Sequence, residues 1–199
     1  MTLRVCWLLP AALLFTGCGR EEKREATNLV KVLIEKKAEL AGINALEKDL
    51  LGSTHSWCES IVAGGAGKGK QLEENATSAK GLAQSAEVIA SQLSQLRQSI
   101  YNQPLKQEYP QSVRGALINS IMKRQKMLQE IRMALDASAT NFLEFAQSRA
   151  YNGDTYPAGI VRLNQILSSY HGPEDVLGKA IDDLKVKYAI QDADLVVKT

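Results

Sequence analysis

The stretch LEENATSAKGLAQSAEVIASQLSQLRQSI, residues 72–100, decides the fold that we expect for this chain. Counted in heptads from Leu72, its apolar and small residues recur at alternating spacings of four and three, and only Arg97 breaks the series. The members are Leu72, Ala76, Ala79, Ala83, Ala86, Ala90, Leu93 and Ile100. This pattern predicts a long amphipathic helix whose alanine seam allows a second helix to approach closely. The seven-residue period predicts a left-handed supercoil with that partner.

The following segment supplies the partner helix. Its connection to the first helix is bracketed by Pro104 and Pro110, which can end one helix and start the next. A second heptad series then consists of Leu117, Ile121, Arg124, Leu128, Ile131, Leu135, Ser138, Phe142, Phe145 and Arg149. The spacing predicts a helix over residues 110–150, in which Arg124 occupies a position that faces the partner.

Further helices complete the expected bundle. A leucine stripe predicts a third long helix from about residue 26 to Leu51, which Gly52-Ser53 would end, followed by a short helical turn over 53–62 and a glycine-rich loop. Two shorter helices are expected over 157–170 and from Pro173 onward, and then a loose tail. The predicted fold is an all-α antiparallel bundle of three long and two shorter helices over residues 26–199. Residues 153–190 would form its fourth side or a docked C-terminal hairpin.

The N-terminus indicates where the chain resides. Arg4 precedes an apolar run of about 11 residues, which is too short to span a bilayer and is typical of a signal peptide. The residues Phe15-Thr16-Gly17-Cys18 then resemble the lipobox of bacterial lipoproteins. The resemblance implies removal of residues 1–17 and attachment of diacylglycerol and fatty acid such as palmitate to Cys18. An ordinary signal peptide cut after Gly19 and an uncleaved anchor are the alternatives.

The lipobox resemblance also sets the expected compartment and surroundings. It implies a cell-envelope protein, on the periplasmic side of the outer membrane in a Gram-negative organism because Gly19 follows the cysteine. Residues 18–25 would be a short charged tether. The remaining chain is close to neutral, which gives no field for nucleic acid. Cys58 would be its single free thiol, most simply a small buried residue.

No constellation of residues predicts catalysis, a metal or a cofactor. Residues 64–71 match the spacing of a phosphate-binding loop, but Gln71 replaces the hydroxyl residue and no strand precedes the loop. His55 and His171 lack the spacing to other ligands that a metal site needs. Lys123, Arg124 and Lys126 form a small basic cluster without aromatic neighbours, which is typical of a solvated helix face. We therefore expect a protein that is not an enzyme.

The sequence leaves two functional hypotheses. The first is a membrane-anchored scaffold or adaptor that contacts an envelope protein partner, with a homo-oligomer through exposed heptad positions as a further option. The second is a small-molecule-binding sensor bundle with a pocket near Arg97 or Arg124, the charged residues of the two seams. A bundle that acts only through its outer faces is expected to tolerate Arg124→Leu, because a seam arginine without a buried partner contributes mainly the packing of its stem.

Overall fold

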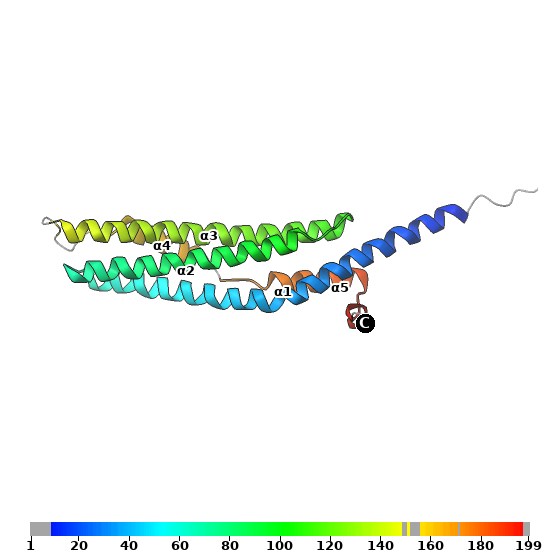
Figure 1. The fold of residues 1–199 in the computed structure, drawn as a ribbon, viewed down its shortest axis with the longest axis horizontal. Coiled ribbons are helices and arrows are strands. Elements are labelled where there is room, and N and C mark those ends of the chain that lie inside the picture. The colour runs from blue at the N-terminus through cyan, green and yellow to red at the C-terminus, as the bar shows by residue number, and fades with distance from the viewer. Residues whose placement is uncertain (1–8, 149–150, 152–155, 171, 197–199) are drawn as a thin grey trace, which may run out of the picture. The chain divides into compact units, whose positions relative to one another are not determined.

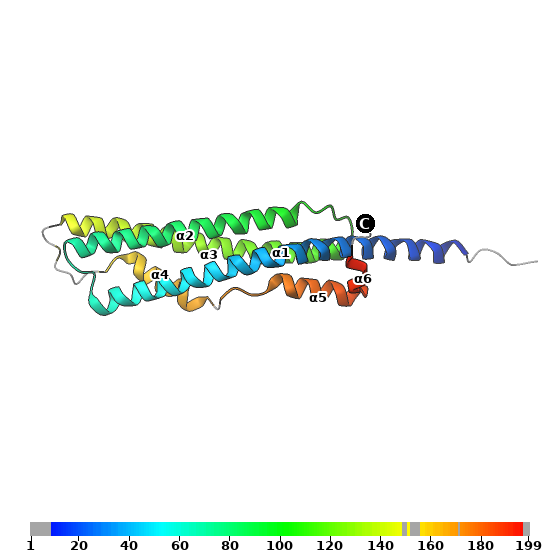
Figure 2. The same cartoon turned by 60° about the horizontal axis from the view of Figure 1, so that its bottom comes forward.

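The computed structural model describes residues 9–148, 151, 156–170 and 172–196, with side chains from residue 19 onward. The elements in chain order are α1 (Leu9–Gly64), α2 (Lys70–Tyr101), α3 (Glu108–Gln147), α4 (Ala158–Ser169), α5 (Val176–Tyr188) and α6 (Asp192–Leu195). The three long helices α1, α2 and α3 pack antiparallel in sequence order, and no strand occurs in the described residues (Figures 1 and 2). The predicted all-α bundle is therefore confirmed.

The chain divides into two compact units, each built from separate segments. Unit 1 consists of the three segments Met1–Ala38, Gln98–Asn119 and Asp175–Thr199, and unit 2 consists of the two segments Glu39–Arg97 and Ser120–Glu174. The three long helices contribute to both units. The short helices do not: α4 belongs to unit 2, whereas α5 and α6 belong to unit 1.

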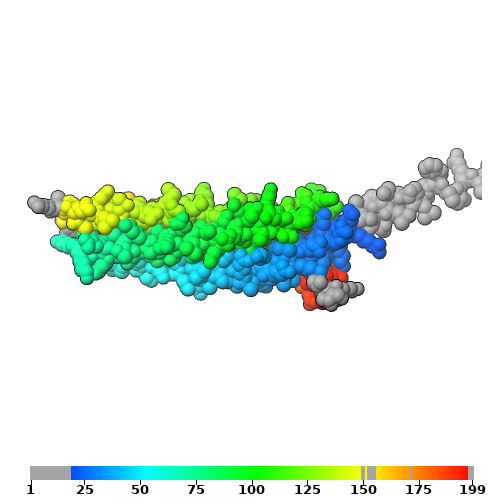
Figure 3. All heavy atoms as spheres, in the orientation of Figure 1, coloured from blue at the N-terminus to red at the C-terminus, as the bar shows by residue number. Residues whose placement is uncertain are grey.

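The two predicted heptad seams lie mostly in unit 2 and form its core, while Ile100 and Leu117 belong to unit 1. Seven of the eight apolar positions of the α2 series are buried, and Ala90 is half-buried. The α3 series is buried from Ile121 to Phe142, including Arg124, while Arg149 lies outside the described residues. In the space-filling view the side chains of α2 lie directly against those of α1 and α3 (Figure 3). The alanine seam of α2 therefore faces the interior, as its pattern predicts.

Helix α1 is longer than the sequence predicts. It does not end at Gly52-Ser53 but continues to Gly64, so that the expected separate turn over residues 53–62 is part of the same helix. Thr54, Cys58 and Ile61 continue its buried stripe at helical spacing. A glycine in a helix interior costs only about 1 kcal/mol, whereas each buried aliphatic side chain contributes about 1.5–3 kcal/mol. The packing beyond Gly52 therefore outweighs the local stop signal.

The glycine-rich loop between α1 and α2 reverses the chain. Gly65, Gly67 and Gly69 have φ values of 78°, 81° and 54°, a region that other residues rarely adopt. Ala66 between them is buried, and its carbonyl oxygen accepts a hydrogen bond from Asn75 Nδ2 at 3.1 Å. The positive φ values of these glycines are thus those that the interhelical turn requires.

In unit 1, α5 packs as a fourth helix. Asp175, and not Pro173, precedes its first turn: the Asp175 carboxylate caps the helix by accepting from the Gly178 N–H at 2.9 Å. Leu177, Ile181 and Leu184 form its buried face. The predicted loose tail is also partly helical, because α6 covers Asp192–Leu195.

In unit 2, α4 is the fourth helix. It lies so close to α3 that a Cβ atom added at Gly159 would overlap the Ser138 hydroxyl and the Ala134 carbonyl oxygen. Ser138 Oγ donates a hydrogen bond to that same carbonyl oxygen at 2.8 Å, so the hydroxyl is not left unpaired where the two helices meet. The small residues Gly159 and Ser138 therefore bring α4 against α3.

Candidate functional site

The most unusual feature of unit 2 is a charged cluster inside its core. Arg124 on α3 is 5 % exposed, and Glu47 on α1 is fully buried. Arg124 Nε donates a hydrogen bond to Glu47 Oε2 at 3.0 Å, and Arg124 Nη2 donates to the same oxygen. Arg124 Nη2 also donates to Asn44 Oδ1 at 2.7 Å. The guanidinium thus reaches two side chains, three residues apart on one face of α1.

Tyr170, which follows the last turn of α4, completes the cluster. Its hydroxyl donates a hydrogen bond to the second oxygen of Glu47, Oε1. Burial, followed by the hydrogen bond and the negative charge of Glu47, raises the pKa of Tyr170 well above its ordinary value. The phenol therefore stays neutral and remains a donor. Both carboxylate oxygens of Glu47 are bonded, and one carboxylate joins α1 to α3 and to the end of α4.

This arrangement meets the requirements of a buried ion pair. Removing two charges from water is costly, and the cost is recovered only where geometry is good and further hydrogen bonds satisfy the remaining polar atoms. Glu47 satisfies this condition through Tyr170, and Arg124 satisfies it in part through Asn44. Arg124 Nη1 is the exception, since it is buried and has no hydrogen-bond partner among the described residues.

Two open pockets adjoin Tyr170, one on each side of α4. The first, between α1 and α4, has a volume of about 530 Å³ and is mainly apolar, with Leu51 and Leu167 among its walls and His55 and Asn164 as polar groups. The second, between α3 and α4, has a volume of about 340 Å³. Tyr170 lines both pockets, so the hydroxyl that holds Glu47 belongs to a side chain that a bound molecule could contact.

The second pocket contains the basic residues that the sequence singled out. Lys123 and Lys126 line its α3 side, and Arg162 lines its α4 side. Arg162 Nη2 is paired with Glu130 Oε2 at 2.7 Å, whereas both lysines are exposed. Exposed lysines of this kind are in keeping with the solvated face predicted for them.

Several predicted residues lie apart from this cluster. Arg97 on α2 is half-buried and lines neither pocket. His55 is exposed and its Nε2 lies 3.2 Å from Glu59 Oε1, while His171 is outside the described residues. Cys18 belongs to α1, but its side chain is not among those described.

Cys58 is a buried free thiol, and burial raises its pKa to about 11. The sequence pattern suggested a small buried residue at this position, and the side chain is fully enclosed. A thiol with a raised pKa is poorly reactive because the thiolate is the nucleophile. Cys58 therefore belongs to the core.

Glu47 was missed at the sequence level, although a signal for it exists. Ile43, Glu47 and Leu50 follow one another at spacings of four and three, so Glu47 occupies a core position of the α1 stripe. An acidic residue in the stripe of one helix and a basic residue in the seam of another are candidates for a buried pair. That pairing would have connected Glu47 to Arg124.

Comparisons with protein families, with curated proteins and with solved structures find no significant match for this chain. Among the described helices, none combines the length and the apolar character needed to cross a membrane. The described residues also contain no group of three or more His, Cys, Asp or Glu side chains placed to hold a metal ion.

Proposed function

We propose that this chain is a lipid-anchored protein of the cell envelope that acts as a scaffold or adaptor through contacts of its helical faces with a partner protein. The anchor in this proposal is Cys18 within Phe15-Thr16-Gly17-Cys18. The helical faces are those of units 1 and 2.

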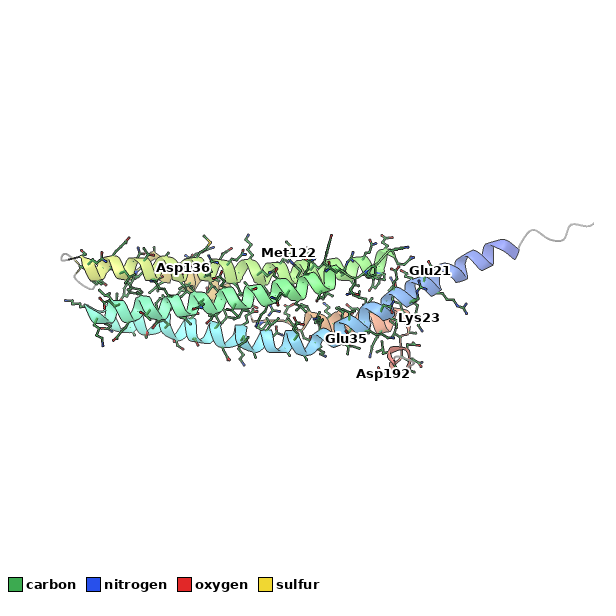
Figure 4. All side chains as sticks on the ribbon, viewed as in Figure 1. Glu21, Lys23, Glu35, Met122, Asp136 and Asp192 are labelled. Atoms are coloured by element: carbon green, nitrogen blue, oxygen red, sulfur yellow. The ribbon has the colours of Figure 1, made fainter. Side chains whose placement is uncertain are left out.

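The observation that favours a contact function is that the charged residue of the α3 seam, Arg124, is already paired inside the bundle. Arg124 was the strongest candidate for holding a ligand, but Glu47 already neutralises it inside unit 2. Apolar side chains are instead available on the outside of α3, where Met122 and Met133 are 47 % and 68 % exposed (Met122 is labelled in Figure 4). Methionine is common on surfaces that adapt to a partner protein.

Site-specific photocrosslinking in cells tests the contact function. A photoreactive residue is placed at Met122 or Met133 on α3 and, as a matched control, at exposed Gln84 on α2. We expect a discrete adduct from the α3 positions that is absent for Gln84 and is lost in Cys18→Ala, whose mature N-terminus cannot be acylated. Mass analysis of the N-terminus is run beside it. An unmodified Cys18 would remove the anchor, and adducts equal at all three positions would remove the specific contact.

A small-molecule-binding bundle is the second candidate, and the pockets beside Tyr170 favour it. Arg124 Nη1 belongs to the same hydrogen-bonded cluster as Tyr170 and is buried with no acceptor among the residues that the structure describes, so an acceptor group of a ligand could satisfy it. A ligand in this place would combine a compact apolar part with an acceptor group.

Thermal-shift screening of small carboxylates with apolar groups tests this second candidate. A ligand that uses the pocket between α1 and α4 should lose its effect in Asn164→Leu and keep it in Lys123→Gln, which alters only the pocket between α3 and α4. No shift with any compound in the unmodified protein would count against the sensor.

A further inference from the structure

We propose that the N-terminal end of unit 1 rests directly on the phospholipid headgroups, held there end-on by a helix that begins at the acylated cysteine without a flexible tether. This inference depends on the lipid anchor of the proposed function. It names the surface that faces the bilayer: the first turns of α1, the connection between α2 and α3, and the segment from the end of α5 to α6.

Helix α1 is continuous through the segment next to the anchor. The helix passes through residues 18–25, the charged segment expected to be a tether, without a break. At a rise of about 1.5 Å per residue, Glu25 lies only about 10 Å along the axis from Cys18. Ala26, one residue further, is already fully buried in unit 1. The folded core therefore begins about two helical turns after the point of acylation.

Several contacts fix the first turns of α1 to the C-terminal segment of unit 1. The Tyr188 hydroxyl donates a hydrogen bond to Glu22 Oε1 at 2.7 Å. Lys23 Nζ donates to the Ala189 carbonyl oxygen at 3.2 Å and lies 3.3 Å from Asp194 Oδ2. In Figure 4, Lys23 and Asp192 lie close to one another at this part of unit 1. The end of α5 and α6 are thereby held beside the residues nearest to Cys18.

The connection between α2 and α3 is also fixed to the start of α1. The Glu25 carboxylate accepts hydrogen bonds from the backbone N–H groups of Lys106 and Gln107, at 2.8 and 2.9 Å. Arg114 Nη1 holds the preceding part of the connection by donating to the Gln103 carbonyl oxygen at 2.6 Å. This connection is thus a second fixed structure beside the start of α1.

The orientation follows from where α1 is apolar. A helix that lies flat in a membrane interface needs an apolar face directed to the lipid. The apolar stripe of α1 in unit 1, which includes Ala26, Leu29 and Leu33, is buried against the protein, and Ile34 is the one large apolar side chain exposed on α1 between residues 19 and 38. Exposed positions such as Arg20 and Arg24 are charged. An end-on arrangement leaves the buried stripe covered, whereas a helix that lay flat would offer the bilayer a single exposed aliphatic side chain, Ile34, and no apolar face.

The charges indicate that the anchor, and not an electrostatic field, holds this surface in place. The segments 19–25, 101–108 and 185–195 each contain equal numbers of basic and acidic residues. Attraction to anionic lipid needs an excess of basic residues, at about 1 kcal/mol for each one near the surface. Contact with the bilayer should therefore be the same on zwitterionic and anionic membranes and should survive high salt.

The test is the relaxation of spin labels by nickel-chelating lipid headgroups. Acylated full-length protein with Cys58→Ala is labelled at Lys106→Cys or at the control position Glu35→Cys, and is placed in phosphatidylcholine vesicles. Both positions are exposed in unit 1, but Glu35 lies about 25 Å along α1 from Cys18. We expect relaxation at position 106 to be enhanced at least threefold over position 35, with no change in anionic vesicles or high salt.

A third protein carries 12 glycine and serine residues inserted between Gly19 and Arg20, and this should remove the enhancement at position 106. Equal relaxation at positions 106 and 35 would overturn the end-on contact, as would an enhancement that the insertion leaves intact or that salt abolishes. Mass analysis of the N-terminus is read first. A Cys18 without lipid overturns the proposed anchor itself, whereas an acylated protein with equal relaxation overturns only this orientation.

Discussion

Glu47 is the residue on which the interior of unit 2 depends most. Its carboxylate is fully buried and is bonded by Arg124 and Tyr170. For a bundle that acts only through its outer faces, the sequence predicts that Arg124→Leu is tolerated or stabilising. The structure predicts the opposite, because the substitution leaves the Glu47 carboxylate buried without its cation. We predict that Arg124→Leu lowers the free energy of unfolding by about 3–5 kcal/mol, as measured by urea denaturation followed by circular dichroism.

The double variant Glu47→Leu/Arg124→Leu is the control for this prediction. It removes both charges and replaces them with apolar side chains, which is often nearly neutral for a buried pair. It should therefore recover most of the loss, with a remaining cost from the unpaired Tyr170 hydroxyl. A double variant as unstable as Arg124→Leu would show that the arginine stem, and not the stranded carboxylate, determines the effect.

Cys58 should make the stability of unit 2 fall at alkaline pH. Its pKa is raised to about 11 from an ordinary value of 9.0, so the fold favours the neutral thiol. The stabilisation is complete below about pH 9 and is lost as the pH rises toward about 11. Between about pH 8 and pH 10.5, the protein should lose about 2 kcal/mol more unfolding free energy than Cys58→Ala does.

Urea denaturation at the two pH values, on mature-length chains with Cys18→Ser, checks the Cys58 prediction. Tyr170 and Tyr188 also have raised pKa values, but they titrate in both chains and cancel in the difference. Equal losses in the two chains would mean that the thiolate is accommodated in the folded core.

At the scale of elements, the long periodic segments could be predicted and the ends of helices could not. The α2 seam repeats over four heptads, so local exceptions such as Arg97 do not change its interpretation. The predicted end of α1 depended on one local signal, Gly52-Ser53. The buried stripe of the helix continues past this signal at Thr54 and Cys58. The stripe is hard to see in the sequence because neither residue is strongly apolar. The packing of the residues after Gly52 therefore determines where α1 ends.

The contact between α4 and α3 depends on Gly159. An alanine there would overlap the Ser138 hydroxyl, which can rotate, and the Ala134 carbonyl oxygen, which belongs to the helix backbone. We predict that Gly159→Ala destabilises unit 2 by about 1–3 kcal/mol, because α4 must move away from α3. Thermal and urea denaturation measure the loss, and hydrogen exchange should show it first in α4.

Gly81→Ala in α2 is the matched control for this glycine. Gly81 is exposed, and a Cβ atom there would meet no other atom within 4 Å. Helix propensity alone should then stabilise the protein by about 0.5–1 kcal/mol. If the two substitutions had the same effect, the contact at Gly159 would have no energetic importance.

At the scale of the whole molecule, the two units share helices but draw their fourth helix from different parts of the chain. The sequence could predict that two short helices follow α3, because their stripes and caps are local. It could not assign α4 to one unit and α5 to the other, because this depends on individual contacts such as Tyr170 with Glu47 and Tyr188 with Glu22. Single hydrogen bonds between distant residues leave no periodic trace in a sequence.

Removal of residues 175–199 should therefore unfold unit 1 and spare unit 2. The deletion takes away α5, α6 and the buried side chains of Leu177, Ile181 and Leu184, all of which belong to unit 1. The backbone amides of residues 22–33 should lose their protection from hydrogen exchange, and those of residues 43–58 should keep it. A chain ending at residue 190 retains α5 and should keep protection in both ranges.

Trp57, the single tryptophan after residue 17, packs edge-on against Phe142 in unit 2, with ring centroids 6.0 Å apart, and reports on that unit by fluorescence. Its emission should be unchanged by the deletion, and a shift to that of a water-exposed tryptophan would mean that the shared helices make both units one cooperative structure.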